Sequence, residues 1–96
     1  MIIQFVRTGG FSGMRREVQL ETMALSPAER GPLERMVGEA GFFSLPAKFP
    51  KPARGADYFT YTLTVDDGGR RHTVEVPQPS VPEALRPLIR ELSKRL

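Results

Sequence analysis

The chain carries few side chains that could act as nucleophiles or metal ligands. It has one histidine, His72, and no cysteine among its 96 residues, which excludes a Cys–His pair and the usual Cys/His zinc sites. His72 lies within a strand-like run on the side expected to face the core, and the sequence indicates no partner for general-base catalysis. We interpret it as a buried or half-buried, hydrogen-bonded histidine. The sequence therefore predicts a protein that is not an enzyme and needs no cofactor.

Two neighbouring acids, Asp66 and Asp67, form another cluster that could bind a cation. Acidic side chains also stabilise turns, because they accept hydrogen bonds from the backbone further along the chain. Gly68 and Gly69 follow directly, between two strand-like runs, and this order is typical of a hairpin turn. The pattern favours a turn, and no metal site is expected.

A cluster of glycines near the N-terminus is the most unusual feature of the sequence. Residues 8–13 read Thr-Gly-Gly-Phe-Ser-Gly and separate two strand-like runs. A phosphate-binding loop needs a helix N-terminus after its glycines, so this setting argues against nucleotide binding. Two interpretations remain: Phe11 covers the sheet edge of its own fold, or the loop presents it to an apolar pocket of a partner. The candidate partner-binding residues are Thr8, Gly9, Gly10, Phe11, Ser12, Gly13 and Met14.

Four runs have the patterns of β-strands and pair as two hairpins. Residues 2–7 are apolar on both faces, as in a strand that is central or covered on both sides, whereas residues 15–22 have one wet face. Residues 58–65 alternate between apolar side chains and a face of tyrosine and threonines. A turn at residues 66–69 then places Leu63, Tyr61 and Phe59 beside His72, Val74 and Val76.

A helix is predicted between the two hairpins. Ser26 and Glu29 have the spacing of a capping box. Because Pro32 cannot donate a backbone hydrogen bond and clashes with the preceding turn, we expect a separate first turn and a main helix over residues 32–40. Gly41 is suited to end that helix in the left-handed conformation.

A second helix is predicted at the C-terminal end of the chain. Ser80 and Glu83 form another possible capping box. Pro87 lies too deep for a regular helix, so a bend or break is expected near Arg86. The apolar stripe consists of Leu85, Leu88, Ile89, Leu92 and Leu96.

These elements predict one α+β domain spanning residues 1–96. The expected architecture is a four-stranded antiparallel sheet, made of two hairpins, with two helices packed on one face. Residues 46–56 contain three prolines and are expected to form a flexible loop within this domain.

The composition argues against several classes of partner. The net charge of +3 is spread along the chain, without the dense basic stripe and interleaved aromatic residues of a nucleic-acid binder. No apolar run approaches the ~20 residues of a membrane span, and the N-terminus lacks the pattern of a signal peptide. We expect a cytoplasmic monomer or weak dimer that binds neither nucleic acid nor membrane.

The glycine cluster also belongs to a longer stretch with a family resemblance. Residues 3–13, Ile-Gln-Phe-Val-Arg-Thr-Gly-Gly-Phe-Ser-Gly, resemble the opening of the emfourin-type proteins, small proteinaceous inhibitors of thermolysin-like metallopeptidases such as protealysin. Residues 48–56 add no support. The likeness spans most of the chain and continues in residues 41–43, 61–65, 67–74 and 85–88.

The resemblance implies a protein inhibitor of a zinc peptidase of the HExxH type. A chain without cysteine or a dense His/Asp/Glu cluster has little to offer the metal, so inhibition is expected to occlude the active-site cleft. Thermolysin-like enzymes prefer a bulky apolar residue just after the scissile bond, and Phe11 on a glycine-rich loop is a group that such a pocket would accept. The alternative is a noncatalytic interaction domain with an unrelated protein partner.

Overall fold

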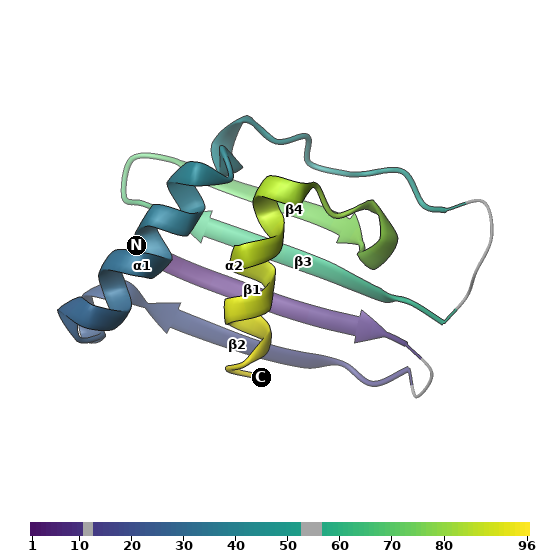
Figure 1. The fold of residues 1–96 in the computed structure, drawn as a ribbon, viewed down its shortest axis with the longest axis horizontal. Coiled ribbons are helices and arrows are strands. Elements are labelled where there is room, and N and C mark those ends of the chain that lie inside the picture. Colours follow the sequence, from purple (N-terminus) through teal and green to yellow (C-terminus); the bar gives the residue numbers. More distant parts are fainter. Residues whose placement is uncertain (11–12, 53–56) are drawn as a thin grey trace.

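The sheet and the helices form two layers. The structure is a computed structural model that describes residues 1–10, 13–52 and 57–96, and within these residues it contains four strands and two α-helices. Both helices, α1 (Pro27–Glu39) and α2 (Arg86–Ser93), cross the same face of the sheet (Figure 1). The predicted α+β architecture is therefore confirmed. The antiparallel strands lie in the order β2-β1-β3-β4, with β1 at Ile2–Gly9, β2 at Arg16–Glu21, β3 at Phe59–Asp66 and β4 at Arg71–Pro77.

Strand β1 occupies one of the two inner positions of the sheet. Ile3 and Phe5 are fully buried beneath the helices, whereas Ile2, on the opposite face, is 40% exposed. The structure confirms the central position, and the opposite face is covered in part, since Val6 on that face is buried. The strand continues past its predicted end at Arg7, because its last two residues pair with Thr60 and Phe59 of β3.

The second hairpin keeps the predicted faces but not the predicted pairs. Val65 lies opposite His72, Leu63 opposite Val74 and Tyr61 opposite Val76. The expected register was wrong by two residues because Asp66 is still part of β3, so the turn consists of residues 67–70. A shift of two residues leaves every side chain on its original face. The apolar faces of both strands therefore still point into the core.

Helix α1 runs without a break through Pro32, contrary to expectation. The first turn is already closed before this residue, because the carbonyl of Ser26 accepts hydrogen bonds from the backbone N–H groups of Glu29 and Arg30 at 3.0 and 2.9 Å. Leu33 is buried directly after the proline. The missing N–H of Pro32 removes a single bond, and the bonding and packing on either side maintain the helix.

Helix α1 begins and ends with the predicted capping residues, but the predicted capping-box hydrogen bonds do not form among the described residues. Ser26 is the N-cap residue, followed by Pro27, and Gly41 adopts the left-handed conformation (φ 59°) just beyond the helix. The reciprocal capping box is absent from this described segment, since the Ser26 hydroxyl donates to the Glu29 carboxylate at 3.2 Å and makes no bond to the backbone.

Helix α2 begins at the predicted break. A short 3-10 turn, Glu83–Leu85, precedes the first α-helical residue, Arg86. The second predicted capping box was wrong, because Pro82 precedes the turn and the Ser80 hydroxyl donates instead to the carbonyl of Pro50 at 3.0 Å. The apolar stripe is confirmed, with Leu85, Leu88, Ile89 and Leu92 buried and Leu96 packed against the core.

The segment after α1 runs beside the outer edge of β4. The backbone N–H of Glu75 donates to the carbonyl of Ala47 at 2.8 Å, and the N–H of Phe49 donates to the carbonyl of Glu75 at 3.0 Å. Phe49 also packs against the core. These bonds satisfy part of the edge of β4, which would otherwise present unpaired backbone groups. Residues 53–56 of the predicted loop lie outside the described residues.

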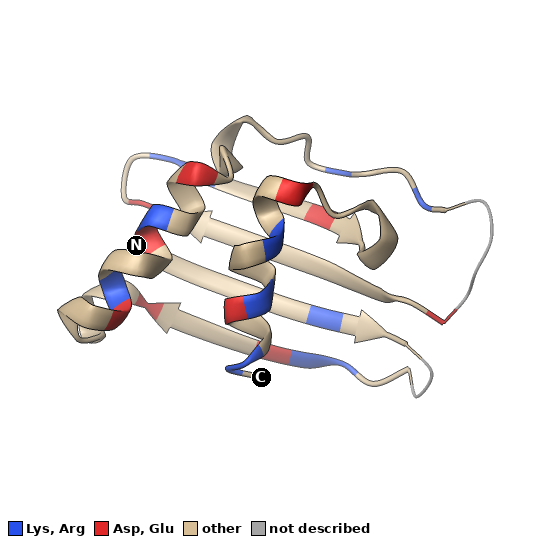
Figure 2. Cartoon of the chain, viewed as in Figure 1, with Lys and Arg blue, Asp and Glu red and all other residues tan. Residues whose placement is uncertain are grey.

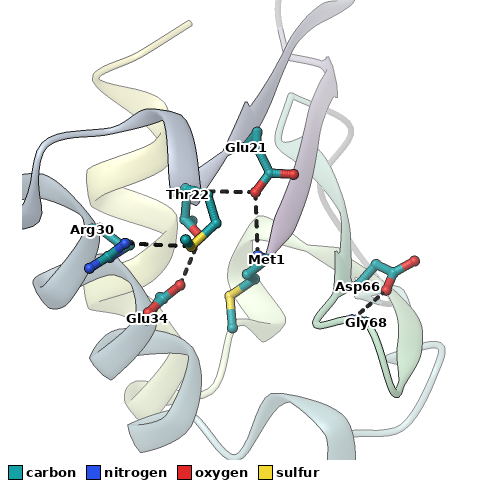
Figure 3. Close-up of polar contacts among 8 residues, drawn as sticks. Met1, Glu21, Thr22, Arg30, Glu34, Asp66 and Gly68 are labelled. Carbon is teal, nitrogen blue, oxygen red and sulfur yellow. Dashed lines mark hydrogen bonds and ion pairs between the residues drawn. The ribbon is translucent and has the colours of Figure 1, made fainter.

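A network of polar contacts joins the start of β1 to α1. Thr22 is fully buried, and its hydroxyl donates to the Glu34 carboxylate at 2.7 Å (Figure 3). The amino group of Met1 lies 3.4 Å from the carboxylate of Glu21. These contacts tie the end of β2 to α1 and to the start of β1. None of the helices built from the described residues has the length and apolar character needed to cross a membrane.

Candidate functional site

The predicted partner-binding residues gather at the end of β1 that is opposite this network. Thr8 and Gly9 belong to the strand, and Gly10 follows it directly. Gly13 and Met14 lie on the way into β2. Phe11 and Ser12 lie outside the described residues, so the structure leaves the choice between the two interpretations of Phe11 open.

The base of the glycine loop is hydrogen-bonded to β3 and to itself. The N–H of Gly10 donates to the carbonyl of Tyr58 at 3.0 Å, and the N–H of Gly13 donates to the carbonyl of Gly10 at 3.4 Å. The Thr8 hydroxyl donates to the carbonyl of Thr60 at 3.5 Å. The loop therefore leaves the sheet between edge strand β2 and inner strand β1, from a base that is bonded to the start of β3.

Gly10 is required by its surroundings. Its φ of +73° lies in the left-handed region, which L-residues other than glycine rarely adopt. A β-carbon at this position would also lie 2.6 Å from Cε1 of Phe59, well inside van der Waals contact. Gly9 and Gly13 share the positive φ, at 86° and 69°. The glycines thus define the path of the chain on both sides of residues 11–12.

An aromatic row connects the loop to the core. The ring of Phe59 lies 6.4 Å from that of Tyr61, which stacks on Phe5 at 5.6 Å. The guanidinium carbon of Arg7 lies 4.4 Å from the centre of the Phe59 ring, within the range of a cation–π interaction. Burial raises the pKa of Tyr61, and the nearby charge of Arg7 partly opposes this rise. The contact between Gly10 and Phe59 therefore joins the loop to packed side chains of the core.

A large apolar side chain is exposed where the loop enters β2. Met14 is 62% exposed, and a β-carbon on the preceding Gly13 would meet nothing within 4 Å. An exposed methionine next to an uncrowded backbone can adapt its shape to a partner. This side of the loop is accessible for an interaction.

A groove lies next to the loop base, between α2 and the ends of β1 and β3. Its volume is about 580 Å³, and Arg7 and Tyr61 form part of its wall. The sequence did not predict this groove or the role of Phe59 beneath the loop, because both depend on the pairing of β1 with β3. The remaining lining residues are Gln78, Val81, Arg86, Ile89, Arg90, Ser93 and Lys94.

The sequence of nearly the whole chain matches a known protein family. The Emfourin family model matches residues 5–93. The chain belongs to the Emfourin family. The match includes the loop, the aromatic row and every lining residue of the groove except Lys94. Neither the curated proteins nor the solved structures contain a match to the chain.

Membership of the Emfourin family makes this protein a metallopeptidase inhibitor and not an enzyme. The predicted family resemblance is confirmed by this match over residues 5–93. The partner class is therefore a metallopeptidase.

The titratable residues that the sequence singled out have structural partners in this Emfourin chain. Nε2 of His72 lies 2.7 Å from the carbonyl oxygen of Leu45, and its ring meets Phe42 edge to face at 5.5 Å. Asp66 and Asp67 accept hydrogen bonds from backbone N–H groups of their own turn. In the described residues, no group of three or more His, Cys, Asp or Glu side chains could hold a metal ion.

Proposed function

We propose that this protein inhibits a thermolysin-like zinc metallopeptidase by occluding its active-site cleft with the loop formed by residues 8–14. Membership of an inhibitor family carries the general function. The observation that supports the choice of this surface is the base of the loop, where Gly10 bonds to the carbonyl of Tyr58, just before β3, and lies against the ring of Phe59, the first residue of β3. A loop on a preorganised base loses less conformational entropy on binding than a free segment does.

The chemistry of the loop fits an apolar pocket. Phe11 is the bulky apolar residue that the pocket after the scissile bond of such an enzyme would accept, and Met14 is an exposed apolar side chain close to it in sequence. Buried aromatic anchors supply much of the binding energy of protein interfaces. Phe11 is therefore the proposed anchor, and Met14 the proposed adjacent contact.

Occlusion accounts for inhibition better than capture of the catalytic zinc. A protein that removed Zn²⁺ would need a set of nitrogen, sulfur or carboxylate ligands arranged around one point. His72 is engaged with Leu45, and Asp67 with its own turn. The proposal predicts inhibition that competes with substrate, leaves the zinc in the enzyme and is not reversed by added Zn²⁺.

The decisive experiment is a titration of the purified protein into thermolysin and protealysin activity assays. Inhibition at or below roughly micromolar concentrations of the protein is expected for a specific protein–protein interface. Metal analysis of the isolated complex should find the enzyme's zinc still bound. Absence of inhibition of both enzymes would count against a thermolysin-like target, and loss of zinc would count against occlusion.

Substitution of the apolar residues tests the proposed surface. Phe11→Ala and Met14→Ala should each weaken inhibition, the former by at least about tenfold, because interface anchors contribute most of the affinity. Met23→Ala is the matched control, since Met23 is 67% exposed but follows β2 at the far end of the sheet. Thermal unfolding establishes that all three variants remain folded. An unchanged inhibition constant for Phe11→Ala would remove this residue from the site.

A further inference from the structure

The groove beside the loop is strongly basic. Four of its lining residues, Arg7, Arg86, Arg90 and Lys94, are cations, and none of the described residues that line it is acidic. Figure 2 shows the basic positions of α2 together with the basic position near the end of β1. The chain as a whole carries a net charge of only +3. The groove therefore concentrates positive charge on one part of a nearly balanced molecule.

Most of these cations have no acidic partner within the described residues. Lys94 lies 3.7 Å from Glu91, but no ion pair involves Arg7, Arg86 or Arg90 in that part of the chain. Arg95, also basic but outside the groove, is paired with Glu29 at 3.2 Å. The arginines of the groove are thus available to an external anion.

Arg86 is the first α-helical residue of α2 and directly follows the 3-10 turn Glu83–Leu85. In the described part of the chain its charge makes no ion pair that would stabilise this end of the helix.

The floor of the groove is apolar. Ile89 and Tyr61 are each 7% exposed, and Val81 packs against the core beside them. Phosphate backbones do not need an apolar floor, because their binding is dominated by contacts between cations and phosphates. A peptide segment with both acidic and apolar side chains matches this combination of surfaces.

Arg7 links the groove to the base of the glycine loop. Arg7 lines the groove and lies over the ring of Phe59, which contacts Gly10. A protein bound to the loop would therefore extend naturally over the groove.

We propose that the groove binds an acidic segment of the target peptidase while the glycine loop occupies the active-site cleft. This inference rests on the proposed inhibitory function and adds a charge-selective contact outside the cleft. Carboxylates of the segment pair with Arg86 and Arg90, and its apolar side chains lie on Ile89. Such a contact speeds association and selects peptidases that carry acidic residues beside the cleft.

The first test compares two pairs of substitutions that remove the same charge. Arg86→Gln/Arg90→Gln removes the groove cations of α2, whereas Arg30→Gln/Arg35→Gln removes two arginines of α1 that lie outside the groove. Inhibition of thermolysin is measured at low salt and at about 0.15 M salt. The groove variant should inhibit about tenfold more weakly at low salt and lose most of its salt dependence, mainly through slower association. The control should stay within about twofold of the unmodified protein.

The refuting outcome is distinct from a failure of the proposed function. Equal inhibition by both variants would overturn the proposed binding of an acidic segment in the groove, and the inhibitory function would still stand.

The second test does not depend on a peptidase. A fluorescein-labelled peptide of alternating Glu and Leu is titrated with each protein and followed by fluorescence anisotropy, with a Gln/Leu peptide as the neutral control. The acidic peptide should bind the unmodified protein and the α1 variant and lose at least about tenfold in affinity for the groove variant. Absence of binding, or equal binding to the groove variant, would overturn the proposal even if inhibition of thermolysin is observed. A single-stranded DNA oligomer of the same charge that binds more tightly than the peptide would also overturn it.

Discussion

The ring of Phe59 occupies the space that a side chain on Gly10 would need. A β-carbon on Gly10 would lie 2.6 Å from Cε1 of Phe59, and the neighbouring N–H of Gly10 donates to the carbonyl of Tyr58. A backbone hydrogen bond therefore holds the start of the loop next to β3. The close approach to Phe59 is possible because Gly10 has no side chain. This relationship makes the loop base sensitive to small changes in side-chain volume.

Gly10→Ala should destabilise the protein and weaken inhibition. The left-handed backbone alone costs a residue with a β-carbon about 1–2 kcal/mol, and the contact with Phe59 adds to this cost or shifts the ring. For a domain of this size each kcal/mol lowers the melting temperature by roughly 4–8 °C. Thermal unfolding and the inhibition constant are the measurements.

Two companion variants separate the causes of that loss. Gly38→Ala lies within α1, where a β-carbon meets nothing within 4 Å, and alanine there should stabilise the helix by about 0.5–1 kcal/mol. Removing the ring with Phe59→Ala should reduce the additional cost of Gly10→Ala, because only the backbone strain then remains. An equal cost in both backgrounds would show that the ring does not constrain Gly10.

Thr22→Val should destabilise the end of the sheet where the N-terminus lies. Thr22 is fully buried, and its hydroxyl donates to the Glu34 carboxylate at 2.7 Å. Valine has a similar shape but leaves that carboxylate without its donor, at a cost of about 1–3 kcal/mol. Thr22→Ser keeps the hydroxyl and should retain more of the stability than valine does. Chemical denaturation of the three proteins measures the difference, and equal stability of the valine variant would show that the bond contributes nothing net.

The sequence predicted most elements of the fold because its local patterns are strong. Alternation indicated the later strands, the apolar run of residues 2–7 indicated the first, and the stripe from Leu85 to Leu92 indicated the last helix. The continuity of α1 through Pro32 could not be predicted, because it depends on hydrogen bonds and packing on both sides of the proline. The Ser80 hydroxyl was likewise assigned to a helix cap, although its acceptor, Pro50, lies 30 residues away along the chain.

Only the glycine loop of the candidate site could be predicted from the sequence. The glycine cluster is visible in the sequence, since glycine types and spacing indicate an unusual backbone. Phe59 could not be connected with Gly10 without knowing that β1 pairs with β3. The basic groove depends on the same pairing and on the position of α2, so its cations, Arg7 and Arg86 among them, are far apart in the sequence.

The hairpin turn between β3 and β4 should lose stability at acidic pH. The N–H groups of Gly69 and Arg70 donate to the Asp67 carboxylate at 3.0 and 2.7 Å, and these bonds lower its pKa below the usual value of 3.8. Because the folded pKa is depressed, this stabilisation is fully present above the unfolded value and is lost as the pH falls through the folded one. Asp67→Asn cannot ionise and should show a smaller loss of melting temperature between neutral and strongly acidic pH. A parallel decline for both proteins would contradict this assignment.

Tyr61 should titrate above the ordinary pKa of tyrosine. Burial disfavours its charged form and raises its pKa from the usual 10.0, while the nearby charge of Arg7 lowers it to a smaller extent. The chain has two tyrosines and no tryptophan, so Tyr58→Phe leaves Tyr61 as the single tyrosine chromophore. The absorbance of tyrosinate should then appear with a midpoint above 10.0, and a midpoint at or below this value would contradict the expected burial.

A second substitution tests the contribution of Arg7 to this titration. In the Tyr58→Phe background, Arg7→Gln removes the charge that favours tyrosinate, so the midpoint for Tyr61 should rise further. Because the folded pKa is raised, the stability linked to neutral Tyr61 is complete below the unfolded value and is lost as the pH rises through the folded one. Tyr61→Phe removes this linkage and should reduce the alkaline decline in melting temperature. A midpoint that falls when Arg7 is replaced would show that the guanidinium acts on the aromatic row by packing and not by charge.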